Sequence, residues 1–337
     1  MNDIPNNAEE LTERAFDAFN EGDLEGAEAL AAQLLALSYS SYFEIQALIH
    51  LERDEPESAL EVLREGVEKA PFVWRLWQLL GNTLSDNDDF KGAMRCYQEA
   101  LQLDLDVGDN ASVQFNRATL LSRMDYSTEA LDVLRELDIT ISEAPLGLQW
   151  RVEVLRLGIF ADLGRCEEVL AHSEVLQSWF LEADEDSVDS LSVAWAEGGG
   201  ALQDCGETEK AREWVMHALK WDRTNGDALQ LLRLSNSAAP LGSRYFQVML
   251  EGHWNDAAGE GDEERGFIKT FMIVARDSEE AKQLALEMEA PHEETSSYAV
   301  EECEDQGECD ESAIGVYEAS AYHLYPISGD DKNNANE

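Results

Sequence analysis

Lysine is scarce in this sequence, which has seven among 24 basic residues, against 71 acidic residues, for a net charge of −47. Binding to nucleic-acid phosphates needs clustered cations, so we expect no nucleic-acid partner. An anionic lipid surface is disfavoured for the same reason. Long apolar runs are also missing from the sequence. Because a membrane helix needs roughly 18 or more such residues in a row, we expect no membrane partner.

The sequence also lacks the marks of secretion. It opens with Met1-Asn2-Asp3-Ile4-Pro5, which has neither the basic start nor the apolar stretch of a signal peptide. We therefore predict a cytoplasmic protein. Cysteines are few and scattered, with no C-x-x-C pair, and in such a setting we expect reduced thiols. The five positions are Cys96, Cys166, Cys205, Cys303 and Cys309.

Signatures of catalysis and cofactor binding are absent. We find no G-x-G-x-x-G after a strand, no P-loop, no G-x-S-x-G and no H-E-x-x-H. The run Gly198-Gly199-Gly200 lies inside a predicted helix and indicates close helix packing. We therefore predict that the protein is not an enzyme and holds no cofactor.

Two metal sites are the alternatives to this prediction. Cysteine and histidine near one end of the chain could form a zinc site, but five residues between the cysteines is a poor zinc spacing. The set is Cys303, Cys309, His292 and His323. A disulfide between the two cysteines is the other possibility, and two loop thiols are the prediction. Asp184, Asp186 and Asp189 alternate like calcium ligands but lack the required glycine and glutamate.

What the sequence does contain is enough apolar material for a core, at 44% hydrophobic residues. The acidity is spread over the whole chain: residues 1–242 carry net −29 and residues 243–337 carry net −18. A binding patch would be more local, so adaptation of the surface to a salty cytoplasm is the favoured explanation of the charge.

The clearest internal pattern runs from Trp77 to Ala100. Trp77 is followed by Leu80-Gly81 and then by Leu84; Ala93 lies twelve residues after Gly81, with an aromatic residue four positions later. Small residues at these positions let two antiparallel helices approach closely. The pattern closely resembles the tetratricopeptide repeat, a helix-turn-helix unit of about 34 residues.

The pattern recurs along the chain. Pairs of small residues lie twelve apart on either side of a polar turn, with one degenerate unit around Gly164 and Val169. The pairs are Ala15 and Ala27, Ala47 and Ala59, Gly81 and Ala93, Ala118 and Ala130, and Gly199 and Ala211. The resemblance therefore implies a mainly α superhelix of about six units over residues 9–237, closed by a capping helix at 227–235.

A smaller domain follows at residues 243–327. Apolar and β-branched runs predict strands at 245–250, 267–275, 297–303 and 315–325, and a helix opens near Asp277. The order is β-β-α-β-β, a small α+β domain with an acidic loop at 301–311. An open edge of its sheet offers a place for a partner strand. Residues 328–337 are predicted to be a disordered polar tail.

The resemblance implies a groove lined by the first helix of each repeat. Some members of the family clamp a peptide carboxylate there; Asn82 and Asn116 fall on the two asparagine positions of that clamp, and Gln78 replaces its first lysine. The predicted groove residues are Arg75, Gln78, Asn82, Phe115, Asn116, Arg151 and Arg156. We predict a non-catalytic module that binds a protein or peptide partner. The alternative is an array that targets a small C-terminal sensor or degenerate enzyme domain.

Overall fold

The computed structural model describes residues 4–37, 39–183, 188–234, 236, 239–254, 265–290, 295–309 and 313–326. The chain divides into two compact units, Met1–Val152 and Glu153–Glu337, and each is described by itself. The predicted tail at 328–337 lies outside the described residues.

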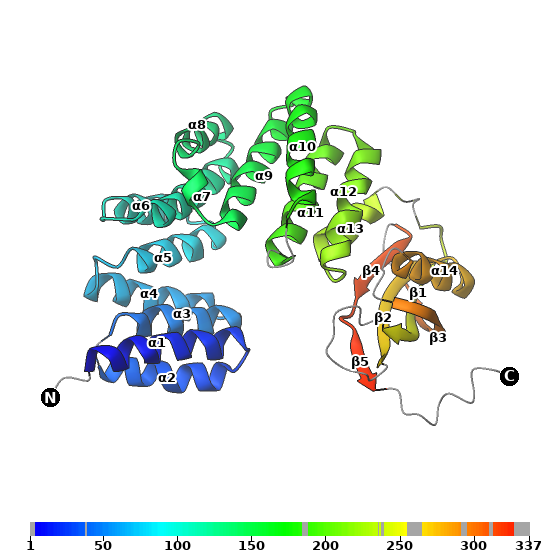
Figure 1. The fold of residues 1–337 in the computed structure, drawn as a ribbon, viewed down its shortest axis with the longest axis horizontal. Coiled ribbons are helices and arrows are strands. Elements are labelled where there is room, and N and C mark those ends of the chain that lie inside the picture. The colour runs from blue at the N-terminus through cyan, green and yellow to red at the C-terminus, as the bar shows by residue number, and fades with distance from the viewer. Residues whose placement is uncertain are drawn as a thin grey trace. The chain divides into compact units, whose positions relative to one another are not determined.

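The first unit is built from antiparallel helix pairs, in which each helix packs on its neighbours in the chain (Figure 1). Its helices are α1 (Ile4–Asn20), α2 (Leu24–Ala36), α3 (Ser41–Glu52), α4 (Pro56–Lys69), α5 (Trp74–Asp86), α6 (Phe90–Leu101), α7 (Val107–Arg123) and α8 (Ser127–Leu137). A short 3₁₀ helix, Ile141–Glu143, precedes α9 (Leu146–Asp162), which runs into the second unit.

The second unit continues the helix pairs and adds the small α+β domain. Its further helices are α10 (Cys166–Leu181), α11 (Val188–Asp204), α12 (Thr208–Trp221) and α13 (Gly226–Leu234). The domain comprises β1 (Arg244–Trp254), β2 (Arg265–Ala275), α14 (Ser278–Glu289), β3 (Thr295–Glu308), β4 (Gly315–Ala319) and β5 (His323–Pro326). The predicted fold class, a helical repeat array followed by a small α+β domain, is confirmed.

One residue with left-handed backbone closes the turn of each helix pair. These residues have φ between 58° and 79°, and they are Gly22, Asp54, Asp88, Asp125, Gly164 and Gly206. In the third pair the amide of Asp89 donates to the carbonyl of Leu84 at 2.8 Å, and the amide of Asp88 donates to Ser85 at 3.1 Å. The other five turns repeat this pair of bonds. This is the Schellman motif, which satisfies the last carbonyls of the first helix.

A buried small or β-branched residue follows each left-handed residue by five positions. These pivot residues are at most 3% exposed, and they are Ala27, Ala59, Ala93, Ala130, Val169 and Ala211. The shared spacing fixes the register of the degenerate fifth unit on Gly164 and Val169. The helices approach closely at Gly81, where an added Cβ would lie 2.5 Å from Tyr97 Cε1.

The sheet is antiparallel, with strand order β3-β1-β2-β4 and with β5 also paired to β2. Strand β1 pairs with β2 from Arg244 opposite Ala275 to Trp254 opposite Arg265. Two details differ from prediction. Strand β3 extends to Glu308, so most of the acidic segment predicted as a loop is paired with β1. Its carboxylates are tolerated because this part of the strand is largely solvent-exposed. The last predicted strand is divided into β4 and β5.

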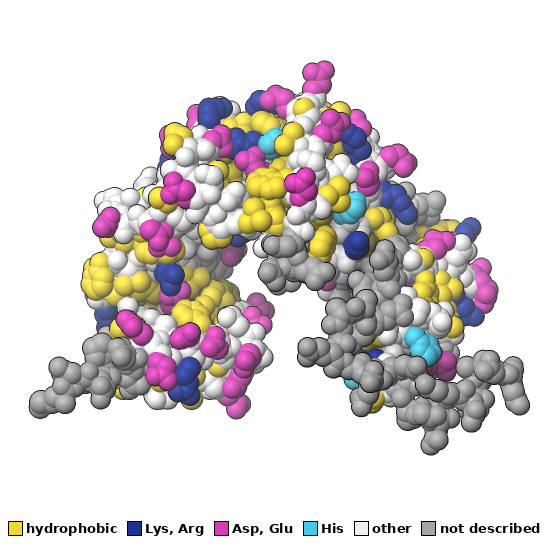
Figure 2. Space-filling view, viewed as in Figure 1, with side chains coloured by type: hydrophobic (Ala, Val, Ile, Leu, Met, Phe, Trp, Pro, Cys, Tyr) yellow, Lys and Arg dark blue, Asp and Glu magenta, His cyan; other side chains and the backbone are white. Residues whose placement is uncertain are grey.

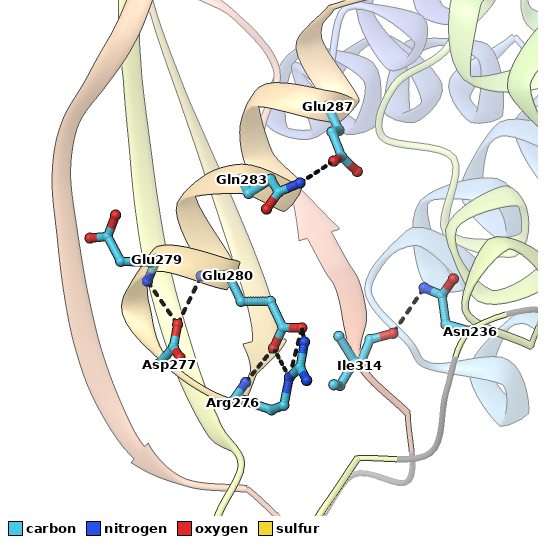
Figure 3. Close-up of polar contacts among 8 residues, drawn as sticks. All are labelled: Asn236, Arg276, Asp277, Glu279, Glu280, Gln283, Glu287 and Ile314. Atoms are coloured by element: carbon cyan, nitrogen blue, oxygen red, sulfur yellow. Dashed lines mark hydrogen bonds and ion pairs between the residues drawn. The ribbon is translucent and has the colours of Figure 1, made fainter.

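Helix α14 begins after an N-cap residue, Asp277 (Figure 3). The carboxylate of Asp277 accepts hydrogen bonds from the amides of Glu279 and Glu280, which stabilises the helix start. Glu280 in turn accepts from the amide of Arg276 at 2.7 Å and pairs with its guanidinium. The predicted helix start at Asp277 is confirmed.

The α+β domain is joined to the end of the helical array through β4. Arg233 Nη1 donates to the carbonyl of Val316 at 2.7 Å. Figure 3 shows the second bond, in which Asn236 Nδ2 donates to the carbonyl of Ile314 at 2.9 Å. Gly315 lies between these two acceptors with φ +147°, and an added Cβ would lie 2.9 Å from Asn236 Nδ2 and 3.0 Å from Arg233 Cγ. Glycine at this position therefore permits the contact between α13 and β4.

Cys166 and Cys205 form a disulfide, with their Cα atoms 5.4 Å apart. The prediction that all five cysteines are reduced is wrong for this pair. Cys166 follows the turn residue Gly164 by two positions and Cys205 precedes the turn residue Gly206, so the bond joins the turns of two consecutive repeats. Sequence spacing alone could not show this, because the two turns meet only when the repeats stack. Cys96, Cys303 and Cys309 are free thiols.

We predict that Cys166→Ser lowers the free energy of unfolding by about 2–4 kcal/mol, since the bond closes a loop of roughly 40 residues in the unfolded chain. Guanidinium unfolding of the oxidised protein, with and without reductant, measures the effect. Cys309→Ser, which changes a free thiol, is the matched control and should leave the midpoint unchanged. Equal midpoints for Cys166→Ser and the oxidised wild type would contradict the prediction.

Candidate functional site

A ladder of polar side chains connects α5 to α7 in the first unit. Gln78 Nε2 donates to Ser112 Oγ at 2.8 Å. One turn further along, Asn116 Nδ2 donates to Asn82 Oδ1 at 3.0 Å. Arg123 Nη1 donates to Ser85 Oγ at 2.7 Å. The ladder therefore joins the first helices of two consecutive repeats and places the predicted groove residues Gln78, Asn82 and Asn116 side by side.

Asn82 has a second role within its own repeat. Its Oδ1 also accepts a hydrogen bond at 2.8 Å from the hydroxyl of Tyr97, which lies on α6 and is only 2% exposed. A buried hydroxyl without a partner would cost free energy, so Asn82 stabilises the helix pair as well as the ladder. Asparagine at this position thus has a structural reason that does not depend on a bound peptide.

Two of the predicted arginines lie exposed beside α7. The Arg75 guanidinium lies 5.4 Å from the centroid of the Trp74 ring, and that of Arg151 lies 4.5 Å from the centroid of the Phe115 ring. Phe115 itself is 6% exposed. The guanidinium of Arg151 therefore packs on the ring of a buried residue.

Acidic side chains on both neighbouring helices respond to Arg75. On α3, burial raises the pKa of the Glu44 carboxyl, and the positive charge of Arg75 opposes the rise. On α7, burial and then Asp106 raise the pKa of the Asp109 carboxyl, and Arg75 again opposes it. The positive charge of Arg75 therefore reaches the first turn of α7, where it partly offsets the rise in the Asp109 pKa.

Arg156 lies in an ion-pair cluster of the second unit. Its Nε is 3.1 Å from Glu153 Oε2, and His172 Nε2 is 2.8 Å from the same oxygen. Burial alone would raise the pKa of the Glu153 carboxyl, but the hydrogen bonds and charges of His172 and Arg156 outweigh it and lower that pKa. The Arg156 side chain is 14% exposed, so its charge is largely used within this cluster.

The repeat with the clearest motif is also the one that a family comparison detects. The model of the family described as Tetratricopeptide repeat matches residues 75–107, which contain α6 and nearly all of α5. Residues 75–107 thus match a tetratricopeptide repeat (TPR). The match covers the part of α5 that carries Arg75, Gln78 and Asn82, and it includes the Schellman turn at Asp88.

Solved structures share the fold of the helical part. A chain of the Cut9–Hcn1 hetero-tetramer of APC/C aligns with a TM-score of 0.52 at 9% identity, over 65% of this chain and 41% of that one. PilW, described as a type IV pilus biogenesis factor, aligns with a TM-score of 0.52 at 14% identity, over 68% of this chain and 98% of its own. PilF of Pseudomonas aeruginosa gives 0.50 at 12% identity, with the same coverage. A comparison with curated proteins gives no match.

A cluster of buried charges in the second unit was not predicted from the sequence. Lys269 on β2 is 1% exposed, and Glu289 at the end of α14 is 0% exposed. The hydroxyl of Tyr322 donates to Glu289 Oε1 at 2.7 Å, and Arg223 Nη1 lies 3.6 Å from the same oxygen. Arg223 comes from the turn between α12 and α13, so three separate parts of the fold meet here.

Lys269 is surrounded by aromatic rings. Its Nζ lies 4.4 Å from the centroid of Tyr322 and 5.3 Å from that of Phe271. Among the described residues, no ion pair or hydrogen bond involves this ammonium group. Burial lowers the pKa of Lys269 to about 8; attraction to Glu289 opposes the shift, and repulsion from Arg223 adds to it. Ring contacts contribute about 0.5–2 kcal/mol, whereas burying an ion costs several kcal/mol.

A cavity of about 380 Å³ opens beside this cluster. Cationic and aromatic side chains provide most of its wall, together with small residues of the segment before β5. The lining residues are Lys220, Trp221, Asp222, Arg223, Thr224, Trp254, Lys269, Ser320, Ala321 and Tyr322. One sign was present in the sequence: Lys269 falls on the same strand face as Phe267 and Phe271, where alternation calls for an apolar residue.

The metal alternatives receive no support from the described part of the chain. It contains no group of three or more acidic, cysteine or histidine side chains that could hold a metal ion. Cys303 Sγ lies 3.9 Å from the carbonyl of Ser278, whereas Cys309 Sγ lies 3.2 Å from that of Ser243. His292, Asp184 and Asp186 lie outside the described residues. No helix among the described residues is long and apolar enough to cross a membrane.

The acidic surface shows no single patch on the face drawn in Figure 2. Acidic side chains are scattered there over helices of the array, with Lys and Arg between them. This matches the even spread of charge along the sequence, where residues 1–242 and 243–337 both carry a large negative net charge.

We predict that Asn82→Ala lowers the free energy of unfolding by about 1–3 kcal/mol, because it leaves the buried Tyr97 hydroxyl without its acceptor. Tyr97→Phe should lower the free energy of unfolding by less, since it removes the hydroxyl itself and leaves no buried donor without an acceptor. Urea unfolding of the two single variants and the double variant gives the coupling between them, expected at about 0.5–3 kcal/mol. Additive effects would mean that the bond contributes nothing.

We predict that Lys269→Met raises the free energy of unfolding by about 1–3 kcal/mol at pH 7, where the folded state bears the cost of a buried ammonium. The lowered pKa means that this cost is relieved as pH rises from about 8 towards the ordinary value of 10.5. The gain should therefore shrink over that interval. Unfolding midpoints from pH 7 to 10.5 measure it, with the exposed Lys282→Met as control. A gain that does not change with pH would contradict the prediction.

Proposed function

We propose that the protein is a non-catalytic interaction module whose TPR array binds a segment of a partner protein along the inner face of α5 and α7. The observation that carries this proposal is the polar ladder with an exposed arginine at each side of α7. The ladder side chains Gln78, Asn82 and Asn116 hold one another in place, so they form a prepared floor that loses little conformational entropy on binding.

The positions of the two arginines indicate which charged groups the partner segment carries. Arg75 acts on the first turn of α7 at Asp109, and Arg151 lies over Phe115, six residues further along the helix. Six residues of α-helix span about 9 Å. An extended peptide covers that length in about three residues. A partner segment with two carboxylates about three residues apart, one of which can be a chain terminus, fits both guanidinium groups.

Charge gives this groove its selectivity. In a chain with net charge −47, most of the surface repels an acidic peptide. Arg75 and Arg151 form no ion pair among the described residues, so an incoming carboxylate does not have to displace an internal partner. Arg156 is left out of the proposal because its guanidinium pairs with Glu153. Arg123 is left out as well, since it contacts Asp86 at 3.3 Å.

We predict that the double variant Arg75→Glu/Arg151→Glu loses partner binding by at least about tenfold, because each reversal replaces an attraction with a repulsion. The full-length protein is used to capture the partner from native cell extract, and the captured protein is then purified and titrated against each variant. Arg135→Glu is the matched control, since Arg135 lies on α8 and is 67% exposed. It makes one such charge reversal away from the groove.

Two outcomes separate the proposal from its alternative. Loss of the partner in the double variant, with retention in Arg135→Glu and unchanged circular dichroism for both, supports the groove. Retention of full affinity in the double variant would overturn it. Binding would then have to be assigned to the C-terminal domain, as a sensor that the array serves to target.

A further inference from the structure

We propose that the cavity beside Lys269 and Arg223 is a binding site for a small organic monoanion, a carboxylate attached to a flat apolar body. The site lies wholly within the second unit, between the α12–α13 turn and the sheet. It is separate from the groove of α5 and α7, and it does not depend on the proposed partner. Three features support the proposal: an ammonium group that has no ionic partner among the described residues, the balance of charges around it, and an aromatic wall.

The first feature is Lys269 itself. It is 1% exposed and lines the cavity, and its ammonium group contacts only aromatic rings among the described residues. A buried charge is usually paired, because desolvation is costly without a counter-ion. A carboxylate in the cavity would supply that counter-ion. Such uncompensated groups in a cleft are more common at functional sites than elsewhere in proteins.

The second feature is the charge balance. Three cations, Lys220, Arg223 and Lys269, face the cavity or its floor, against two carboxylates, Asp222 and Glu289. Arg223 and the hydroxyl of Tyr322 both approach Glu289, so this carboxylate is already engaged. Among these described side chains, the cations outnumber the carboxylates by one. A single excess charge matches a monoanion better than a phosphate dianion, which would add repulsion in a strongly acidic protein.

The third feature is the aromatic part of the cavity wall. The Trp254 ring meets the Tyr322 ring edge to face at a centroid distance of 4.9 Å, and Tyr322 meets Phe267 in the same way at 5.3 Å. Trp221 adds a further indole to the lining. Rings held in this way present a rigid apolar surface that favours a flat apolar body. At about 380 Å³ the cavity is within the usual size of small-molecule sites.

The test uses three probes on the full-length protein: 2-naphthoate, its uncharged analogue 2-naphthamide, and inorganic phosphate. Isothermal titration calorimetry at pH 7 should show one saturable site for 2-naphthoate, with 2-naphthamide and phosphate each about tenfold weaker or more. Naphthoate and naphthamide of equal affinity would overturn the role of the charge. Phosphate of equal affinity would overturn the ligand class.

Variants then place the site. Lys269→Met should weaken 2-naphthoate about tenfold and abolish its preference over the amide. Lys282→Met removes an exposed lysine on α14 that pairs with Glu279, and should leave both probes unchanged. Trp254→Leu should weaken the binding of both naphthalene probes and keep the preference for the acid. Because this variant retains Lys269, it tests the aromatic wall separately from the charge. Binding unaffected by either Lys269→Met or Trp254→Leu would overturn the proposal.

The pH dependence gives an independent readout. Naphthoate binding requires the charged form of Lys269, so its affinity should fall between pH 7 and pH 9.5 in the wild type and in Lys282→Met. The charged and titratable side chains that face Lys269 are Arg223, Asp222 and Lys220 from the α12–α13 region, Glu289 from α14, and Tyr322. In Lys269→Met the affinity should not change with pH. A fall of equal size in that variant would assign the titration to another group and overturn the role of Lys269.

Discussion

The architecture of the helical array depends on one backbone conformation that is repeated in each turn. A left-handed residue ends the first helix of the pair, and a buried pivot residue lies five positions later. The first fixes the direction in which the chain leaves the helix, and the second fixes how closely the returning helix approaches. The polar ladder between α5 and α7 requires both, since its side chains meet only if consecutive pairs adopt the same geometry.

Aspartate replaces glycine at three of these turns, Asp54, Asp88 and Asp125. Aspartate is among the few residues other than glycine that adopt left-handed backbone at modest cost. A strongly acidic sequence can therefore form the same turn with aspartate in place of glycine. The regular fold of the repeats is therefore compatible with the acidity of the chain.

Local patterns allowed much of the fold to be predicted from the sequence. The pivots, the polar turns and the Trp77 motif act over a few residues, so their spacing is visible in the chain. The disulfide and the Lys269 cluster could not be predicted in this way. Cys166 and Cys205 belong to different repeats, and Lys269 meets Glu289 and Arg223 only after the sheet, α14 and the α12–α13 turn have come together. The length of β3 was also missed, because strand pairing outweighs the low strand preference of acidic residues.

The candidate groove shows the same division. Helical spacing placed Gln78, Asn82 and Asn116 correctly next to one another, but it could not show that their polar groups bind each other and Tyr97. Nor could it show that Arg156 is held by Glu153 and His172 while Arg75 and Arg151 remain exposed. Position along a helix is encoded locally, whereas the availability of a side chain depends on which partners the fold brings to it.

The covalent bond between the turns of the fifth and sixth repeats changes how this array resists unravelling. In a linear array each repeat is stabilised only by its neighbours, so opening usually proceeds from a free end, one repeat at a time. Repeats linked through Cys166 and Cys205 separate less readily, and α13, which follows them, is held by β4 through Arg233 and Asn236. The last repeats, α13 and the small domain therefore behave as one cooperative block, and fraying at the C-terminal end of the array is suppressed.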